Sequence, residues 1–134
     1  MPISVVPPST YYPTLSHTLL LARNNIASVD MREVCSNMRD ITSISLEHND
    51  ITHIGREDYL GCSELEELDL SYNNIATISQ YSLTGLKLKK LKVLGNYIIC
   101  FDKTFLDKFS YVLVIEIDLR FLECNCESKW VLEW

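Results

Sequence analysis

Five cysteines are the residues best able to do chemistry in this chain of 134 residues. Cys124 and Cys126 form a C-x-C pair near the end, and Cys35, Cys62 and Cys100 are spread along the chain. An odd number leaves at least one thiol unpaired in a monomer. A zinc site needs four ligands at suitable spacing, and one C-x-C pair does not supply them. The cysteine spacing therefore predicts no metal site.

The histidines and glycines give no sign of a reactive centre. His17, His48 and His53 are scattered, and no Ser/His/Asp set or Cys/His pair has the spacing that nucleophilic catalysis needs. The four glycines are isolated, so no phosphate-binding loop is formed. We therefore expect no enzymatic activity and no cofactor, and we expect the histidines to lie on the solvated surface.

Composition further narrows the classes of protein to which the chain could belong. Hydrophobic residues make up 47% of the chain, which is typical of a globular domain. The net charge of −6 disfavours a nucleic-acid partner, which requires a basic face. No apolar run reaches the length of a membrane span. The Pro-rich start lacks the basic and apolar regions of a signal peptide.

Apolar residues recur in phase along most of the chain, each group followed by an asparagine. The clearest copy occupies residues 65–78 and has the pattern L-x-x-L-x-L-x-x-N-x-L, filled by Leu65, Leu68, Leu70, Asn73, Ile75 and Ile78. Positions equivalent to Asn73 recur in steps of 25, 24, 23 and 24 residues, at Asn24, Asn49, Asn73, Asn96 and Arg120. This is the pattern of a leucine-rich repeat.

One copy cannot fold alone. Six buried side chains contribute about 12 kcal/mol, whereas ordering the backbone of one copy costs at least about 24 kcal/mol. The copies must therefore stack. The predicted fold is an α/β leucine-rich repeat solenoid, with short parallel strands on the concave face and irregular turns with short helical pieces on the convex side. We expect a Pro-rich lead-in over residues 1–16, about five repeats over 17–120, and a separate C-terminal segment over 121–134.

The asparagines are expected to form a ladder. An Asn side chain supplies one acceptor and two donors for backbone groups in the bend after each strand. Arg120 has no acceptor and cannot continue this ladder. The lead-in leaves the first repeat with an open apolar end. We expect the explanation to be that repeats upstream of this chain are missing from it. The alternative is that the lead-in covers that end through its apolar side chains, Ile3, Val5, Val6, Tyr11 and Tyr12.

A second set of apolar positions falls about ten to fourteen residues after each asparagine and is expected to face the core from the convex side. Its members are Val34, Met38, Tyr59, Cys62, Leu83, Leu86, Leu106 and Phe109. Cys62 is accordingly predicted to be a small buried core residue, as free cysteine often is. Cys35 and Cys100 lie in loop-like segments, and a disulfide between them would span several repeats and is not expected.

Residues between the buried strand positions point to the concave face, because strand side chains alternate. Across neighbouring strands they form three columns: Thr18, Ser43, Glu67, Lys90, Val114; Leu20, Ser45, Asp69, Lys92, Glu116; and Ala22, Glu47, Ser71, Leu94, Asp118. We expect Glu67 to pair with Lys90, and Asp69 and Glu116 with Lys92. These pairs either satisfy each other at the surface or belong to a partner-binding strip. The candidate contact residues are Glu47, His48, Glu67, Asp69, Ser71, Tyr72, Lys90, Lys92 and Glu116, with Tyr72 as the aromatic anchor.

The end of the chain carries a second pattern. Cys124-x-Cys126 is followed by Trp130, then by Leu132 and Trp134. This resembles the opening of the C-terminal cysteine cap of extracellular leucine-rich repeat proteins, such as Toll-like receptors and the Slit-type and neuronal adhesion families. Arg120 and Phe121 replace the usual Asn-Pro of those caps. The two tryptophans lie at i, i+4 and would plug the open end of the core.

The resemblance implies what the chain does. In such caps each of the two cysteines pairs with a later cysteine, so we expect this chain to be a fragment that ends inside its own cap. The implied function is recognition of a protein ligand or co-receptor by a cell-surface or secreted receptor ectodomain, in innate immune sensing or in cell adhesion and guidance. The alternative is an intracellular, cytoplasmic adaptor or regulatory array with reduced cysteines. A dimer through the repeat surface or the open ends is possible in either setting.

Overall fold

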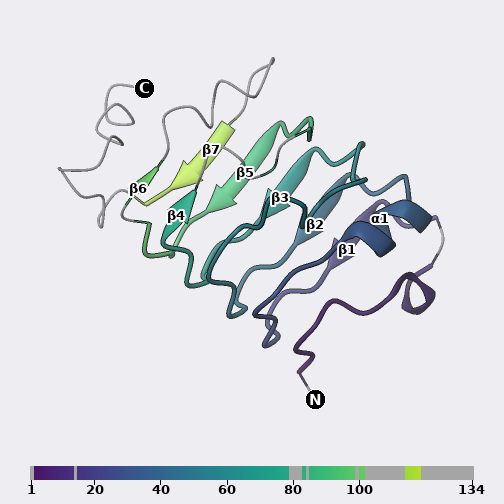
Figure 1. The fold of residues 1–134 in the computed structure, drawn as a ribbon, viewed down its shortest axis with the longest axis horizontal. Coiled ribbons are helices and arrows are strands. Elements are labelled where there is room, and N and C mark those ends of the chain that lie inside the picture. The colour runs from purple at the N-terminus through teal and green to yellow at the C-terminus, as the bar shows by residue number, and fades with distance from the viewer. Residues whose placement is uncertain are drawn as a thin grey trace.

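Successive copies of the repeat form successive coils of a solenoid in the computed structural model, which describes residues 2–13, 15–78, 83, 85–98, 100–101 and 114–118. The main sheet has five parallel strands in chain order: β1 (Thr18–Leu20), β2 (Ser43–Ser45), β3 (Glu67–Asp69), β5 (Lys90–Val93) and β7 (Val114–Ile117). They follow one another along the molecule in Figure 1. This confirms the predicted leucine-rich repeat solenoid.

Four further elements lie outside the main sheet within the described residues. A second parallel sheet pairs β4 (Thr77–Ile78) with β6 (Cys100–Phe101). The convex side carries a short helix, α1 (Arg32–Asn37), and a 3-10 turn, η1 (Ser9–Tyr11), precedes the first repeat. Asp30 Oδ1 accepts a hydrogen bond from the Arg32 backbone N–H at the start of α1, and Val34 and Cys35 are its buried residues. No helix within these ranges is long and apolar enough to cross a bilayer.

The strand register sets which side chains share a column. Thr18 pairs with Ser43, Ser43 with Glu67, and Glu67 with Lys90, which in turn pairs with Val114. The next column runs through Leu20, Ser45, Asp69, Lys92 and Glu116. These two of the three predicted columns are confirmed. A slip of one residue would have turned the buried leucines toward solvent, and burial of one face therefore fixes the register.

The core lies inside the coils and is built from the apolar positions of the repeat. Leu65, Leu68 and Leu70 of the central copy are fully buried, as are Ile75 and Ile78. The convex positions are also confirmed where the structure describes them, at Val34, Met38, Tyr59, Cys62, Leu83 and Leu86. Leu106 and Phe109 lie outside the described residues. Each coil thus contributes apolar side chains from both of its sides to one continuous core.

A disulfide joins Cys35 and Cys62, whose Cα atoms are 5.0 Å apart. Cys62 is buried as predicted, but it is not a free thiol, and that part of the prediction is wrong. The two cysteines belong to adjacent repeats, and stacking brings α1 of one coil against the convex turn of the next. Met31 N–H donates to Asp58 O in the same contact. The two cysteines are 27 residues apart in the chain, and this spacing gave no direct sign that they pair.

The asparagine ladder forms, and its rungs at Asn49, Asn73 and Asn96 have the same geometry. Asn73 Oδ1 accepts from Ile51 N–H of the preceding coil at 3.0 Å, and its Nδ2 donates to Leu46 O of that coil and to Leu70 O of its own. Asn49 and Asn96 repeat these bonds one coil earlier and one coil later. All three are buried, so the ladder satisfies backbone groups that water cannot reach.

The N-terminal lead-in continues the ladder by one rung. Ile3 N–H donates to Asn24 Oδ1, and Asn25 N–H donates to Ile3 O, as Asp50 N–H does to Ile26 O in the next coil. Ile3, Val6 and Tyr12 pack against the core, whereas Val5 and Tyr11 remain exposed. Three of the five lead-in side chains named from the sequence therefore cover the first repeat. The purple segment beyond β1 in Figure 1 shows this placement.

The expectations for the last repeat and the cap lie outside the described residues. They concern Arg120 and Phe121, the pair Cys124 and Cys126, and the two tryptophans Trp130 and Trp134.

Candidate functional site

The candidate site is the concave face of the main sheet. We define the concave strip as Glu47, His48, Glu67, Asp69, Tyr72, Lys90, Lys92 and Glu116. The side chains of the strip lie on β2, β3, β5 and β7 or directly after them, and each is partly or fully exposed. The parallel ladder therefore holds them at fixed spacing on a rigid support.

Ser71 does not belong to this surface. Its side chain is 3% exposed, and its Oγ accepts a hydrogen bond from Leu94 N–H of the next coil. The sequence placed it among the contact residues because it continues the column of Glu47. In the structure the chain has already begun to turn there, and the hydroxyl faces the neighbouring backbone. Ser71 is a structural residue.

Ion pairs in the strip run diagonally between strands. Lys92 Nζ lies 3.2 Å from Glu67 Oε1, and Lys90 Nζ lies 2.9 Å from Glu116 Oε1. The predicted pairs between residues in direct register, Glu67 with Lys90 and Lys92 with Asp69 and Glu116, are wrong. Asp69 Oδ1 accepts from Ser71 N–H instead. A lysine side chain is long enough to reach the diagonal neighbour.

These ion pairs shift the pKa values of Glu116 and Lys92 in the directions expected for paired charges. The hydrogen bond from Lys90 lowers the pKa of Glu116 below its usual value. The hydrogen bond to Glu67 raises the pKa of Lys92. Both lysines of the strip are engaged in ion pairs. Glu47 and Asp69 form no ion pair with any residue that the structure describes.

Two rings stack at the exit of the strands. The ring centroids of His48 and Tyr72 are 4.5 Å apart and the planes differ by 7°. Tyr72 is 49% exposed, so part of its ring remains available. The two residues occupy equivalent positions in adjacent coils, each directly before a ladder asparagine. Stacking fixes both rings before any partner arrives, which reduces the entropy lost on binding.

The backbone before each ladder asparagine is left-handed. The φ angles of Arg23, His48 and Tyr72 are 60°, 56° and 57°, and Gly95 has 63° in the next coil. A Cβ on Gly95 would overlap the Tyr72 ring, with Cε1 at 2.7 Å. The ring of Tyr72 therefore lies across the bare backbone of Gly95. In the sequence, Gly95 was counted only as an isolated glycine. Its position, equivalent to that of Tyr72 in the repeat, could have indicated that it lies beside the Tyr72 ring.

Gly95→Ala is expected to unfold more easily than the wild type and to displace Tyr72 from His48. The left-handed backbone costs a residue with a Cβ about 1–2 kcal/mol, and overlap with the ring adds to that. Chemical denaturation measures the loss, and NMR ring-current shifts of the His48 ring protons report the stack. Gly85→Ala is the matched control. Gly85 has φ 81° with nothing within 4 Å of an added Cβ, so that variant should keep the stack.

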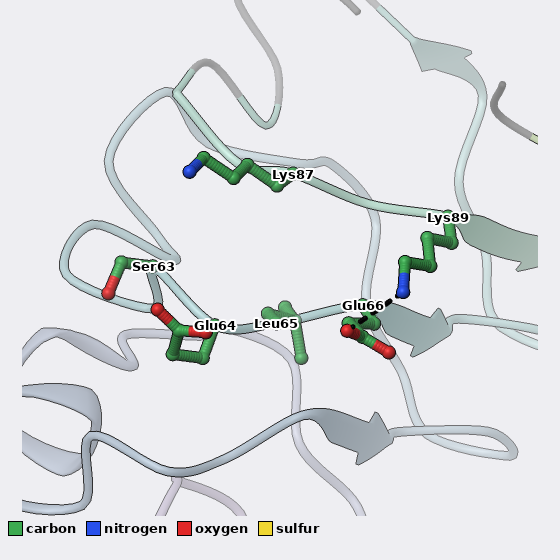
Figure 2. A pocket seen from close by; sticks show the side chains of 6 residues that line it. All are labelled: Ser63, Glu64, Leu65, Glu66, Lys87 and Lys89. Atoms are coloured by element: carbon green, nitrogen blue, oxygen red, sulfur yellow. Dashed lines mark hydrogen bonds and ion pairs between the residues drawn. The ribbon is translucent and has the colours of Figure 1, made fainter. Parts of the chain in front are cut away.

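A separate groove lies on the rim of the solenoid, at the entrance to β3 and β5. It measures about 180 Å³ and is lined by Ser63, Glu64, Leu65, Glu66, Lys87 and Lys89 (Figure 2). The ion pair between Lys89 and Glu66, 3.0 Å, closes its inner side. Within the described ranges no group of three or more His, Cys, Asp or Glu side chains is placed to hold a metal ion.

Comparison with known proteins supports the repeat assignment. Residues 39–98 match the family described as Leucine rich repeat, a range that includes β2, β3 and β5 and three rungs of the ladder. Residues 39–98 are therefore similar to leucine-rich repeats in sequence, and the coils that the structure describes have the corresponding fold. Podocan from Mus musculus is 41% identical over 56 residues, which is 42% of this chain and 9% of podocan. The match thus spans a small part of podocan's length.

Proposed function

We propose that the chain is a protein-recognition scaffold that binds its ligand on the concave strip. The observation that carries the proposal is the preformed stack of His48 and Tyr72, which is half-exposed and set among charged side chains on a rigid sheet. Aromatic residues held in place on a surface are typical binding anchors. Stacked coils give an extended concave surface, which suits a macromolecular ligand.

The charges of the strip favour a basic contact region on the ligand. Four carboxylates lie in the strip, on Glu47, Glu67, Asp69 and Glu116, against two ammonium groups, on Lys90 and Lys92. Since both lysines are engaged in ion pairs, the excess charge is negative and lies at Asp69 on β3 and at Glu47, which follows β2. A ligand with lysine or arginine side chains at this point would meet a complementary potential.

We further propose an extracellular or cell-surface setting, as part of a receptor ectodomain of Toll-like or Slit-like type. The disulfide between Cys35 and Cys62 supports it, because disulfides persist in oxidising compartments. The alternative, an intracellular adaptor, requires these thiols to be reduced. Alkylation of the native, non-reduced protein followed by peptide mass spectrometry separates the two. Unmodified Cys35 and Cys62 support the first setting, and labelled thiols at both positions support the second.

Tyr72→Ala is expected to weaken binding of a protein ligand by about tenfold or more, the usual effect of removing an aromatic anchor. The wild-type chain is tested against an array of secreted and membrane-protein ectodomains, and each hit is titrated by surface plasmon resonance. Affinity should also fall as salt concentration rises, since the strip and the ligand carry opposite charges.

Leu60→Ala serves as the control. Leu60 is an exposed apolar residue on the convex turn, away from the strip, and its truncation should leave affinity unchanged. A ligand whose affinity responds to Leu60→Ala and not to Tyr72→Ala would contradict the proposal. Circular dichroism and thermal melts of each variant confirm that the fold is kept.

A further inference from the structure

The N-terminal end of the solenoid differs from the rest of the surface in its charge. All 12 basic and 18 acidic residues of the chain lie from Arg23 onward. The lead-in and β1 therefore carry only uncharged side chains, although the protein carries a net charge of −6. Several of them are large and exposed: Leu20 is 74% and Leu15 is 78% exposed, and Val5 and Tyr11 are exposed as well.

The same end carries an open strand edge. Parallel pairing uses alternate residues: Ser43 N–H donates to His17 O, Leu21 N–H donates to Ser45 O, and Arg23 N–H donates to Glu47 O. The backbone groups of Thr18 and Leu20 therefore point away from β2. Within the described residues β1 has no second neighbour, since it stands first in the sheet. The lead-in covers the ladder side of this coil and leaves the strand edge open.

We propose that this end is a self-association surface, where β1 pairs with β1 of a second copy of the chain in antiparallel order about a twofold axis. Pairing would satisfy the outward backbone groups of Thr18 and Leu20 in both copies. It would join two sheets of five strands into one continuous sheet. A twofold contact places the same patch on both sides, so the patch must complement itself.

The charge distribution favours a second copy of the chain as the partner at this surface. Two copies of a protein with a net charge of −6 repel each other over most of their surfaces. The uncharged edge formed by the lead-in and β1 is the region where they approach with the least repulsion. Natural edge strands are commonly protected by lysine or other charged residues, and β1 carries none. The lead-in also carries a groove of about 430 Å³, lined by uncharged residues between Pro2 and Tyr11.

The test is the mass of the full 134-residue chain in solution. Sedimentation equilibrium over a concentration series should show a reversible dimer whose dissociation constant does not rise with salt concentration, because the contact is uncharged and salt screens the repulsion between the two copies. Leu20→Lys should raise the dissociation constant at least about tenfold, since it brings two ammonium groups together across the axis. The exposed side chain can be replaced without disturbing the core, and a thermal melt verifies this.

A second variant keeps the proposal falsifiable. Thr18→Pro removes an outward N–H without removing a bond to β2 and should weaken the dimer to a similar degree. Leu60→Lys is the matched control, because Leu60 is also exposed, at 57%, but lies on the convex turn. It should leave the dissociation constant unchanged. A wild-type chain that is monomeric up to on the order of 100 μM, or a dimer unaffected by both β1 variants, overturns the proposal.

Discussion

Asn73→Ala is expected to lower the free energy of unfolding by about 3–5 kcal/mol, from one orphaned buried donor and three lost hydrogen bonds. Asn73 Oδ1 is the acceptor for Ile51 N–H, which the substitution leaves buried without a partner. Its Nδ2 donates to three carbonyls, on Leu46, Leu70 and Ser71. Guanidinium denaturation followed by circular dichroism measures the loss.

Asn74→Ala is the matched control for this effect. The neighbouring Asn74 side chain is exposed, and only its backbone N–H takes part in the ladder, donating to Ile51 O. That bond survives truncation, so the stability should change by no more than about 0.5 kcal/mol. Similar losses in the two variants would show that the ladder side chains do not hold the coils together, and would remove the rigid support on which the concave strip depends.

The double variant Cys35→Ala with Cys62→Ala is expected to lose about 3.5 kcal/mol of stability, the chain-entropy value for a disulfide that closes a loop of this length. The bond links residues 27 apart in adjacent coils. Without it, the contact between α1 and the next convex turn depends on buried apolar side chains and on the bond from Met31 N–H to Asp58 O. Differential scanning calorimetry should show a lower melting temperature.

A reducing agent provides the internal control. It should lower the stability of the wild type to the level of the double variant and should not change the double variant. This comparison separates the Cys35–Cys62 bond from the three other cysteines, Cys100, Cys124 and Cys126. A reductant effect of equal size in both proteins would assign the stabilisation to a disulfide between two of those cysteines and would contradict the prediction.

The two largest effects therefore act on different sides of each coil. The ladder holds the bend that follows the strands, and the disulfide holds the convex side. Both fix the position of one coil against the next. The concave strip needs both, because its columns exist only while neighbouring strands keep their register.

The sequence by itself determined the fold and the register. The repeated spacing of leucines and asparagines leaves one way to stack the coils that buries every apolar position, and a slip of one residue would reverse each strand. The columns through Glu67 and Asp69, the buried convex residues and the ladder at Asn49, Asn73 and Asn96 all follow from that constraint. Each depends on which face a residue takes, which periodicity encodes directly.

Only the tertiary structure decided which neighbouring side chains meet. Cys35 bonds to Cys62 because stacking places two convex turns together at a distance that spacing along the chain does not specify. Lys92 pairs with Glu67 on the diagonal, whereas Asp69 accepts a hydrogen bond from the Ser71 backbone N–H. Tyr72 lies over Gly95 because a residue one coil away lacks a Cβ. Such choices depend on reach, packing and competition between coils, and periodicity carries no information about them.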